Sequence, residues 1–245
     1  LLFAYTFYIC RKGDVFMRGK AGTVVLIIVL LVMIIACQSL SKELQEHIAQ
    51  NREASAAVSN DRGTVVLDPG HGGIDAGKIG INNAEEKEIN LNIALKIKKL
   101  LEDNKISVIM TRTADERLAD THKGDLEERV RIMNEEQPSI VVSIHQNSYQ
   151  SPEVKGPQVF YYTNSVEGRK AAKILQSALN EINTSHSREA KENASYYILK
   201  RAEVPVVIAE CGFLSNAEEA AKLVSDEYQD ILAGAIAAGV EEYMD

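Results

Sequence analysis

From Thr64 onward, short apolar runs alternate with longer segments of helical periodicity. The apolar runs are rich in β-branched residues and predict strands. They lie at residues 64–68, 106–112, 139–145, 158–163 and 204–210. The helical patterns lie at residues 87–103, 125–136, 167–182 and 226–243. Apolar strands with helices between them predict a three-layer α/β domain, in which a mostly parallel mixed sheet has helices on both faces.

Two of the predicted helices have a clear apolar face. In the first helix this face consists of Ile89, Ile93, Ile97, Leu100 and Leu101. In the second it consists of Leu126, Val130 and Met133. We expect Asp125 to cap the second helix, because a side-chain oxygen at that place can accept from a free backbone N–H.

The N-terminal part has a different pattern. Residues 21–40 contain no charged residue, and as a helix rising ~1.5 Å per residue they would span the ~30 Å hydrocarbon core of a bilayer. Four basic residues precede them, namely Arg11, Lys12, Arg18 and Lys20. Positive charge ahead of an apolar segment keeps that end in the cytosol. The pattern predicts a transmembrane anchor or signal at 21–40, with the rest of the chain on the extracytoplasmic side.

Further boundaries follow from this segment. Residues 1–20 are expected to be cytosolic, and residues 1–16 are expected to be upstream sequence if Met17 is the start. The run "IIAC", Ile34 to Cys37, also resembles a bacterial lipoprotein signal, so cleavage and lipidation at Cys37 is the alternative to an uncleaved anchor. Residues 41–63 are polar and then turn-rich, which is typical of a tether. The catalytic domain is predicted at 64–245.

Composition excludes several other functions. The formal net charge of −8 argues against a nucleic-acid partner. The three cysteines are scattered, at Cys10, Cys37 and Cys211, so the sequence has no thiolate zinc cluster and no disulfide framework. We expect Cys211 to be a small buried apolar residue. Of the other histidines, His47 lies in the tether, and His122 and His186 lie in polar stretches and are expected to be solvated.

Three ionisable residues stand at the ends of predicted strands. His71 follows the first strand in "LDPGHGG", His145 ends the third in "VVSIH", and Glu210 ends the last in "VVIAE". The carboxyl ends of parallel strands meet at one edge of a sheet, where active sites form. The glycines around His71 would bring it round the strand end and leave room for a substrate.

An acidic group completes this set. Glu85, Glu86 and Glu88 stand at the start of the first helix, directly after the Gly-rich loop. Two imidazoles and one carboxylate with an open fourth position are typical of a catalytic zinc site, and a second glutamate could then act as a base. The residues alone leave open which glutamate is the ligand.

Five motifs occur in the same order as in a known protein family. They are "LDPGHGG", "EKEINL", "TRTAD", "SIHQN" and "ECGFLSNAEEA". Together they resemble the zinc-dependent N-acetylmuramoyl-L-alanine amidases of the amidase-3 family, over residues 64 to about 243. The resemblance implies one zinc held by His71, Glu86 and His145, with Glu210 as the catalytic base. Gln146 departs from the family's usual alanine, and we expect it to alter substrate contacts.

The resemblance also implies an activity. Family members hydrolyse the amide bond between the lactyl group of N-acetylmuramic acid and L-alanine in peptidoglycan. The stretches "THKGDLEERVRIMN" and "GPQVFYY" look most like the sporulation branch, which acts on spore cortex on the way to muramic δ-lactam. The alternatives are a non-catalytic peptidoglycan-binding regulatory module and a zinc hydrolase for another amide. The sequence leaves the need for an activator protein open.

Overall fold

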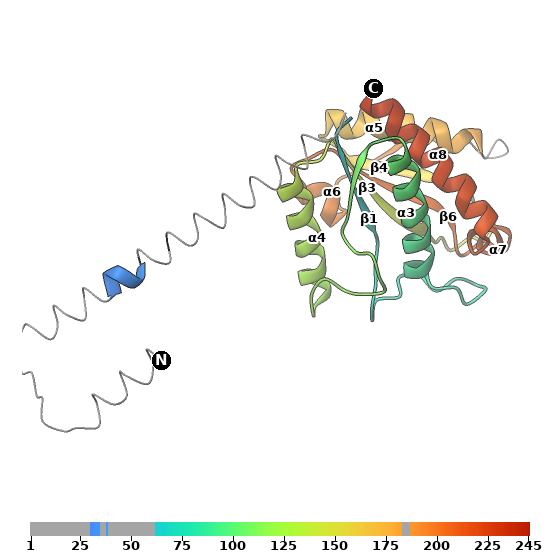
Figure 1. The fold of residues 1–245 in the computed structure, drawn as a ribbon. Helices are drawn as coiled ribbons and strands as arrows, with labels where there is room; N and C mark the ends of the chain where they lie inside the picture. Colours follow the sequence, from blue (N-terminus) through green and yellow to red (C-terminus); the bar gives the residue numbers. More distant parts are fainter. Residues whose placement is uncertain (1–29, 35–37, 39–61, 183–186) are drawn as a thin grey trace, which may run out of the picture. The chain divides into compact units, whose positions relative to one another are not determined.

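A six-stranded sheet with the strand order β2-β1-β3-β6-β4-β5 forms the centre of the domain in the computed structural model (Figure 1). The strands are β1 (Thr64–Pro69), β2 (Ser107–Met110), β3 (Ile140–Asn147), β4 (Gln158–Tyr162), β5 (Lys191–Asn193) and β6 (Val206–Phe213). Strands β2, β1, β3 and β6 are parallel to one another, whereas β4 pairs with β6 in the antiparallel direction. The expected mostly parallel mixed sheet is confirmed.

Helices cover both faces of this sheet, as expected. They are α3 (Glu86–Asp103), α4 (His122–Glu136), α5 (Val166–Glu181), α6 (Tyr197–Arg201), α7 (Ala217–Leu223) and α8 (Asp226–Met244). Helices α3, α5 and α8 pack on one face, and α4 and α6 pack on the other (Figure 1). Alternate residues of each central strand therefore enter different cores: Val65 and Leu67 of β1 face α3, while Val66 faces α4. Burial on both faces explains why these strands are continuously apolar.

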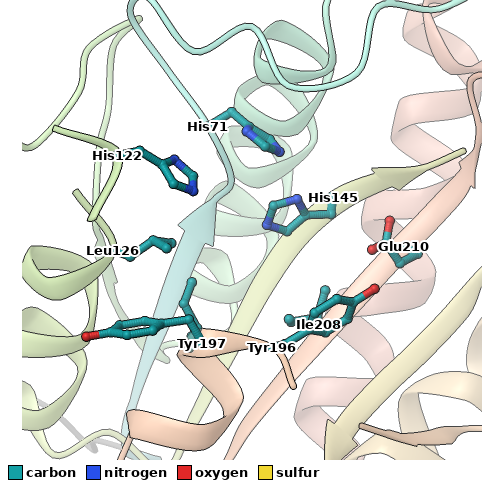
Figure 2. Close-up of a pocket in the computed structure, with 9 residues that line it drawn as sticks. His71, His122, Leu126, His145, Tyr196, Tyr197, Ile208 and Glu210 are labelled. Atoms are coloured by element: carbon teal, nitrogen blue, oxygen red, sulfur yellow. The ribbon is translucent and has the colours of Figure 1, made fainter. Parts of the chain in front are cut away.

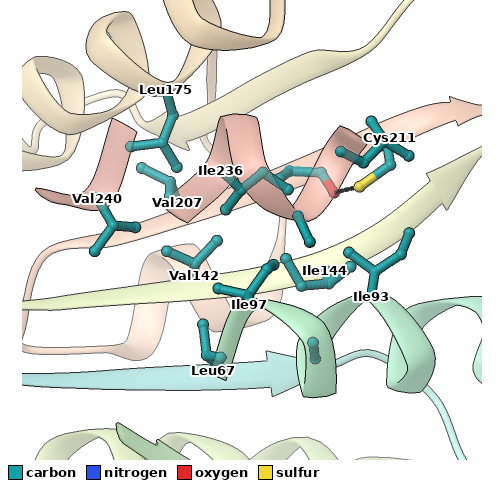
Figure 3. Close-up of a cluster of buried hydrophobic side chains, with 14 of the residues drawn as sticks. Leu67, Ile93, Ile97, Val142, Ile144, Leu175, Val207, Cys211, Ile236 and Val240 are labelled. Atoms are coloured by element: carbon teal, nitrogen blue, oxygen red, sulfur yellow. Dashed lines mark hydrogen bonds between the residues drawn. The ribbon is translucent and has the colours of Figure 1, made fainter. Parts of the chain in front are cut away.

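The larger core lies between the sheet and the α3–α5–α8 layer (Figure 3). Ile93 and Ile97 of α3 pack there against Val142 and Ile144 of β3. One residue of the predicted apolar face of α3 does not belong to it, because Leu100 is 37% exposed while Leu101 is fully buried. A 3.6-residue repeat puts two adjacent leucines about 100° apart, so only one of them points at the core.

Side chains cap four of the helices. Thr121, Ser165, Asn216 and Ser225 each accept from a backbone N–H in the first turn of α4, α5, α7 and α8 respectively. The expectation that Asp125 caps α4 is wrong. Asp125 lies inside the helix, where its carboxylate accepts from Leu118 N–H and from the Arg129 guanidinium. The helix begins three residues earlier than the apolar pattern indicated.

The structure describes residues 30–34, 38, 62–182 and 187–245. Residues 30–34 are helical. In these described ranges, no helix combines the length and the apolar character needed to cross a membrane. Most of the predicted anchor at 21–40 and nearly all of the tether at 41–63 lie outside the described residues. Residues 60–245 form a unit distinct from residues 1–59.

Candidate metal centre

The loop after β1 brings His71 to the edge of the sheet by a path that two glycines make possible. His71 itself has a left-handed backbone, with φ +62°. A Cβ on Gly70 would lie 2.1 Å from Cε1 of His145. A Cβ on Gly77, where φ is +68°, would lie 2.7 Å from both Glu86 Oε2 and His71 Cδ2. The glycines are thus needed because backbone passes directly against the functional side chains.

Glu86 is fixed at the first residue of α3. This helix has no side-chain cap; instead the Lys78 carbonyl accepts from Glu86 N–H, at 3.0 Å. The Lys78 N–H in turn donates to Glu86 Oε2 at 2.7 Å, and Gln146 N–H donates to Oε1 at 3.0 Å. The carboxylate is therefore held from two sides by backbone and has little freedom to rotate.

Glu86 joins the two imidazoles. Its Oε1 lies 3.3 Å from Nε2 of His71 and 2.9 Å from Nδ1 of His145. Each of the three residues offers a ligand atom, and these atoms all lie within 4.8 Å of one another. Two imidazole nitrogens and one carboxylate oxygen are a donor set that zinc accepts. The residues predicted as ligands are thus brought together by the fold, and their donor set fits the metal.

The charges of this group depend on one another. Burial by itself lowers the pKa of His71, but the hydrogen bonds and charges of Glu86 and Asp75 outweigh it and raise the pKa to about 9. Burial opposes ionisation of Glu86, yet His145 and His71 outweigh burial and lower the pKa of that carboxyl. Without a metal, the raised pKa of His71 favours a protonated imidazole beside the buried Glu86 carboxylate. A divalent cation would replace that proton.

Glu210 lies beside this group and is held differently. It is opposite His145 in the pairing of β6 with β3 and is 8% exposed. Its Oε2 is buried and has no hydrogen-bond partner among the described residues. Burial raises the pKa of Glu210 to about 7, with the His145 and Glu86 charges acting in opposite directions. A carboxyl group with a pKa near neutrality that faces a pocket is suited to proton transfer.

A pocket of about 360 Å³ adjoins two of the three predicted ligands, His71 and His145 (Figure 2). His71, His145 and Glu210 line it together with side chains of α4 and α6. Leu126 and His122 of α4 form one side, and Tyr196 and Tyr197 form another (Figure 2). The Tyr196 ring stacks edge-on against Phe160, at 5.6 Å between centroids. The pocket combines an apolar, aromatic wall with ionisable groups, as substrate sites do.

Sequence reasoning missed several of these residues. Asp75 Oδ2 accepts a hydrogen bond from Nδ1 of His71 at 3.0 Å, and this contact aims Nε2 at Glu86. Tyr196 precedes and Tyr197 begins a five-residue helix that is too short to leave a periodic pattern. The sequence offered one signal for Asp75, its place four residues after His71 in the Gly-rich loop. His122 was expected to be solvated; it is exposed, but it lines the pocket.

The remaining candidates lie outside the pocket. Glu85 is partly exposed and pairs with Lys87. The effect of Gln146 on substrate contacts stays a prediction; its side chain is buried on the α3 side and donates to Asn90 Oδ1 at 3.1 Å. Cys211 is fully buried, and burial raises the pKa of its thiol, so it is the apolar residue that was expected. His47 and His186 lie outside the described residues.

The chain is similar to known proteins over most of its length. Residues 65–242 match the Amidase_3 family, described as N-acetylmuramoyl-L-alanine amidase. The germination-specific N-acetylmuramoyl-L-alanine amidase of Bacillus subtilis is 36% identical over 187 residues, which cover 73% of this chain and 78% of that protein. Two solved structures are also similar.

The first is the CwlD amidase from Clostridioides difficile in complex with the GerS lipoprotein. It has a TM-score of 0.71 and 34% identity over 74% of this chain and 98% of that one. The second is the catalytic domain of the CwlV amidase from Bacillus (Paenibacillus) polymyxa. It has a TM-score of 0.68 and 31% identity over 74% and 98% of the two chains. With the family match covering most of the chain, this protein belongs to the N-acetylmuramoyl-L-alanine amidase family, whose members are hydrolases.

Proposed function

We propose that this enzyme hydrolyses the amide bond between the lactyl group of N-acetylmuramic acid and L-alanine, with one zinc held by His71, Glu86 and His145. The observation that carries the proposal is the meeting of these three ligand atoms within 4.8 Å, beside an unpartnered buried carboxylate. When bound, zinc would supply a Lewis acid for the amide carbonyl.

The chain's own residues account for the rest of the reaction. Glu210 accepts a proton from the attacking water as the new C–O bond forms, and it returns a proton to the alanine nitrogen as the C–N bond breaks. Glu210 lines the pocket, and its buried Oε2 has no protein donor among the described residues that would compete for the carboxylate. Tyr196, Tyr197 and Leu126 line the pocket with apolar surface that can bind the sugar–peptide junction and exclude water.

We further propose that the substrate is spore-cortex peptidoglycan. The similarity to a germination-specific amidase and to a CwlD amidase supports this choice. The experiment is digestion of purified cortex and vegetative peptidoglycan, with mass spectrometry of the products. Glycan with a free lactyl carboxyl and peptide with a free L-alanine amine are expected, more rapidly from cortex. Binding without cleavage would favour the regulatory module, and cleavage of another amide would favour a different zinc hydrolase.

For the N-terminal part, we propose an uncleaved membrane anchor at 21–40, a tether at 41–63 and an extracytoplasmic catalytic domain. The uncharged run and the four preceding basic residues support this orientation. Protease added outside protoplasts should digest the catalytic domain and leave a protected N-terminal fragment. A domain that stays protected would reverse the orientation, and a lipid on the Cys37 thiol would show the lipoprotein alternative instead.

A further inference from the structure

Two buried arginines lie beneath the metal-binding loop. Arg112 and Arg129 are 2% and 1% exposed, respectively, which is unusual for so polar a side chain. Between them they donate to the backbone carbonyls of three consecutive residues, Pro69, Gly70 and His71. A buried guanidinium must satisfy its donors inside the protein, so these contacts fix the arginines and the loop together.

The backbone carbonyl groups of these three residues all accept hydrogen bonds from the two arginines. Pro69 O accepts from Arg112 Nε at 2.9 Å and from Arg129 Nη1 at 2.8 Å. Gly70 O accepts from Arg112 Nη2 at 3.0 Å. His71 O accepts from Arg129 Nη2 at 2.7 Å. The two guanidinium groups therefore hold three consecutive carbonyls in fixed directions.

His71 needs such support because its backbone is left-handed, with φ +62°. Residues other than glycine rarely adopt this conformation unless their surroundings impose it. Arg129, which donates to His71 O, is itself held in place by buried polar groups. Its Nη1 donates to Asp68 Oδ1 at 2.6 Å, and Thr111 and Ser143 donate to the same carboxylate. These buried groups that hold Arg129 therefore come in part from β1 and its neighbour β3.

Arg129 also connects the loop to the pocket wall. It belongs to α4, which carries Leu126 and His122 at the pocket, and its Nε donates to Asp125 Oδ2 at 2.8 Å. The same side chain that supports His71 therefore sets the position of α4 against the loop. A lysine could pair with Asp68, but its single ammonium cannot reproduce the planar fork that reaches Asp68, Asp125 and two carbonyls.

We propose that Arg129 is a positioning residue for zinc: its guanidinium holds His71 in the metal-binding conformation and thereby raises the zinc affinity of the site. This inference rests on the proposed metal site. It assigns to Arg129 a role beyond general stability, so its test must separate metal affinity from folding.

The test compares Arg129→Lys with Met133→Ala in the full chain, with zinc as the only ligand. Met133 lies one turn further along α4 and is fully buried, so its truncation destabilises the same helix without touching the loop. Zinc affinity is measured by competition with a chromophoric chelator, well below the melting temperatures of both variants. We expect Arg129→Lys to bind zinc about 10–100-fold more weakly than the wild type, the usual effect of losing support behind a ligand. Met133→Ala should lower the melting temperature and keep wild-type zinc affinity.

The outcomes separate the two proposals. If the wild-type protein binds no zinc, the proposed metal site fails. If the wild type binds zinc and Arg129→Lys binds it equally well, or if Met133→Ala weakens binding to the same extent, the positioning role is overturned. An Arg129→Lys variant that stays unfolded in saturating zinc also overturns it, because Arg129 would then serve the whole fold.

Discussion

His145 and Glu210 lie directly opposite each other on the neighbouring parallel strands β3 and β6. The two side chains line the same pocket, but their surroundings differ (Figure 2). His145 Nδ1 is 2.9 Å from Glu86 Oε1, whereas Glu210 Oε2 has no partner in the described part of the chain. Strand β3 thus presents an imidazole that contacts the proposed ligand Glu86, and β6 presents a carboxyl group that lines the pocket without such a contact.

Glu210→Gln should therefore keep the metal and lose the reaction. The amide has the shape of the carboxylate and leaves the contacts of Glu86 unchanged, but it cannot accept a proton. We expect wild-type zinc content and a rate reduced by about 10²–10⁴-fold. Turnover of a muramoyl-peptide and bound zinc are measured on the same sample. Loss of zinc, with recovery when zinc is added, would make Glu210 a ligand instead of a base.

Glu86→Gln should lose activity for the opposite reason, because it loses the metal. Replacing an anionic ligand with a neutral amide weakens the metal site, so bound zinc and activity should fall together. Added zinc should restore part of the activity by mass action. Glu85→Gln is the matched control, because Glu85 is the preceding residue and pairs with Lys87 outside the metal group. If Glu85→Gln loses zinc while Glu86→Gln keeps it, the ligand is one residue earlier than proposed.

Much of the fold could be predicted from the sequence, because the central strands are buried on both faces. Their continuous apolar runs stand out from the helical patterns around them. The ends of strands were harder to place: β6 continues three residues beyond Glu210, to Phe213. The three-residue strand β5 and the short helices α6 and α7 left no periodic signal.

The site was predicted only as far as residue type and position at a strand end allow. His71, His145 and Glu210 follow that rule. Neither Asp75 nor Tyr196 does, since their roles depend on how a loop and a short helix fold back over the sheet edge. Gln146 directly follows His145 in sequence, yet its side chain points to the α3 side, because successive residues of a strand alternate between faces.

Acid should destabilise the protein through Asp68. Burial opposes ionisation of this carboxyl, but Arg129 and the hydrogen bonds from Ser143 and Thr111 outweigh it and lower its pKa. A carboxyl whose pKa is lower in the folded state adds stability above its unfolded value, near 3.8, and that stability is lost as the pH falls through the folded value. The melting temperature should therefore fall steeply below about pH 4.

Asp68→Asn shows whether this carboxyl is the cause. The variant should lose about 3–5 kcal/mol at neutral pH, because Arg129 loses its buried partner. It should also have a shallower acid dependence than the wild type. Glu128→Gln is the control: its partner Arg131 also lowers the pKa of Glu128, but this pair is on the surface and should matter little. Equal acid dependence in Asp68→Asn and the wild type would remove Asp68 as the source.

Gly70→Ala should disrupt the metal centre more than its single methyl group suggests. The new Cβ would lie 2.1 Å from Cε1 and 2.3 Å from Nε2 of His145, so either the imidazole or the loop must move. Arg112 and Asn90 both donate to Gly70 O and hold the loop, so we expect the imidazole to be displaced. Zinc affinity should then fall together with activity.

Gly234→Ala is the matched control, because Gly234 lies on α8 with no atom within 4 Å of its added Cβ. That variant should gain about 0.5–1 kcal/mol of stability, since alanine favours a helix over glycine, and should bind zinc as the wild type does. Melting temperature, zinc affinity and turnover are measured for both variants. If Gly70→Ala binds zinc normally, the close approach of Gly70 to His145 is not what fixes the imidazole.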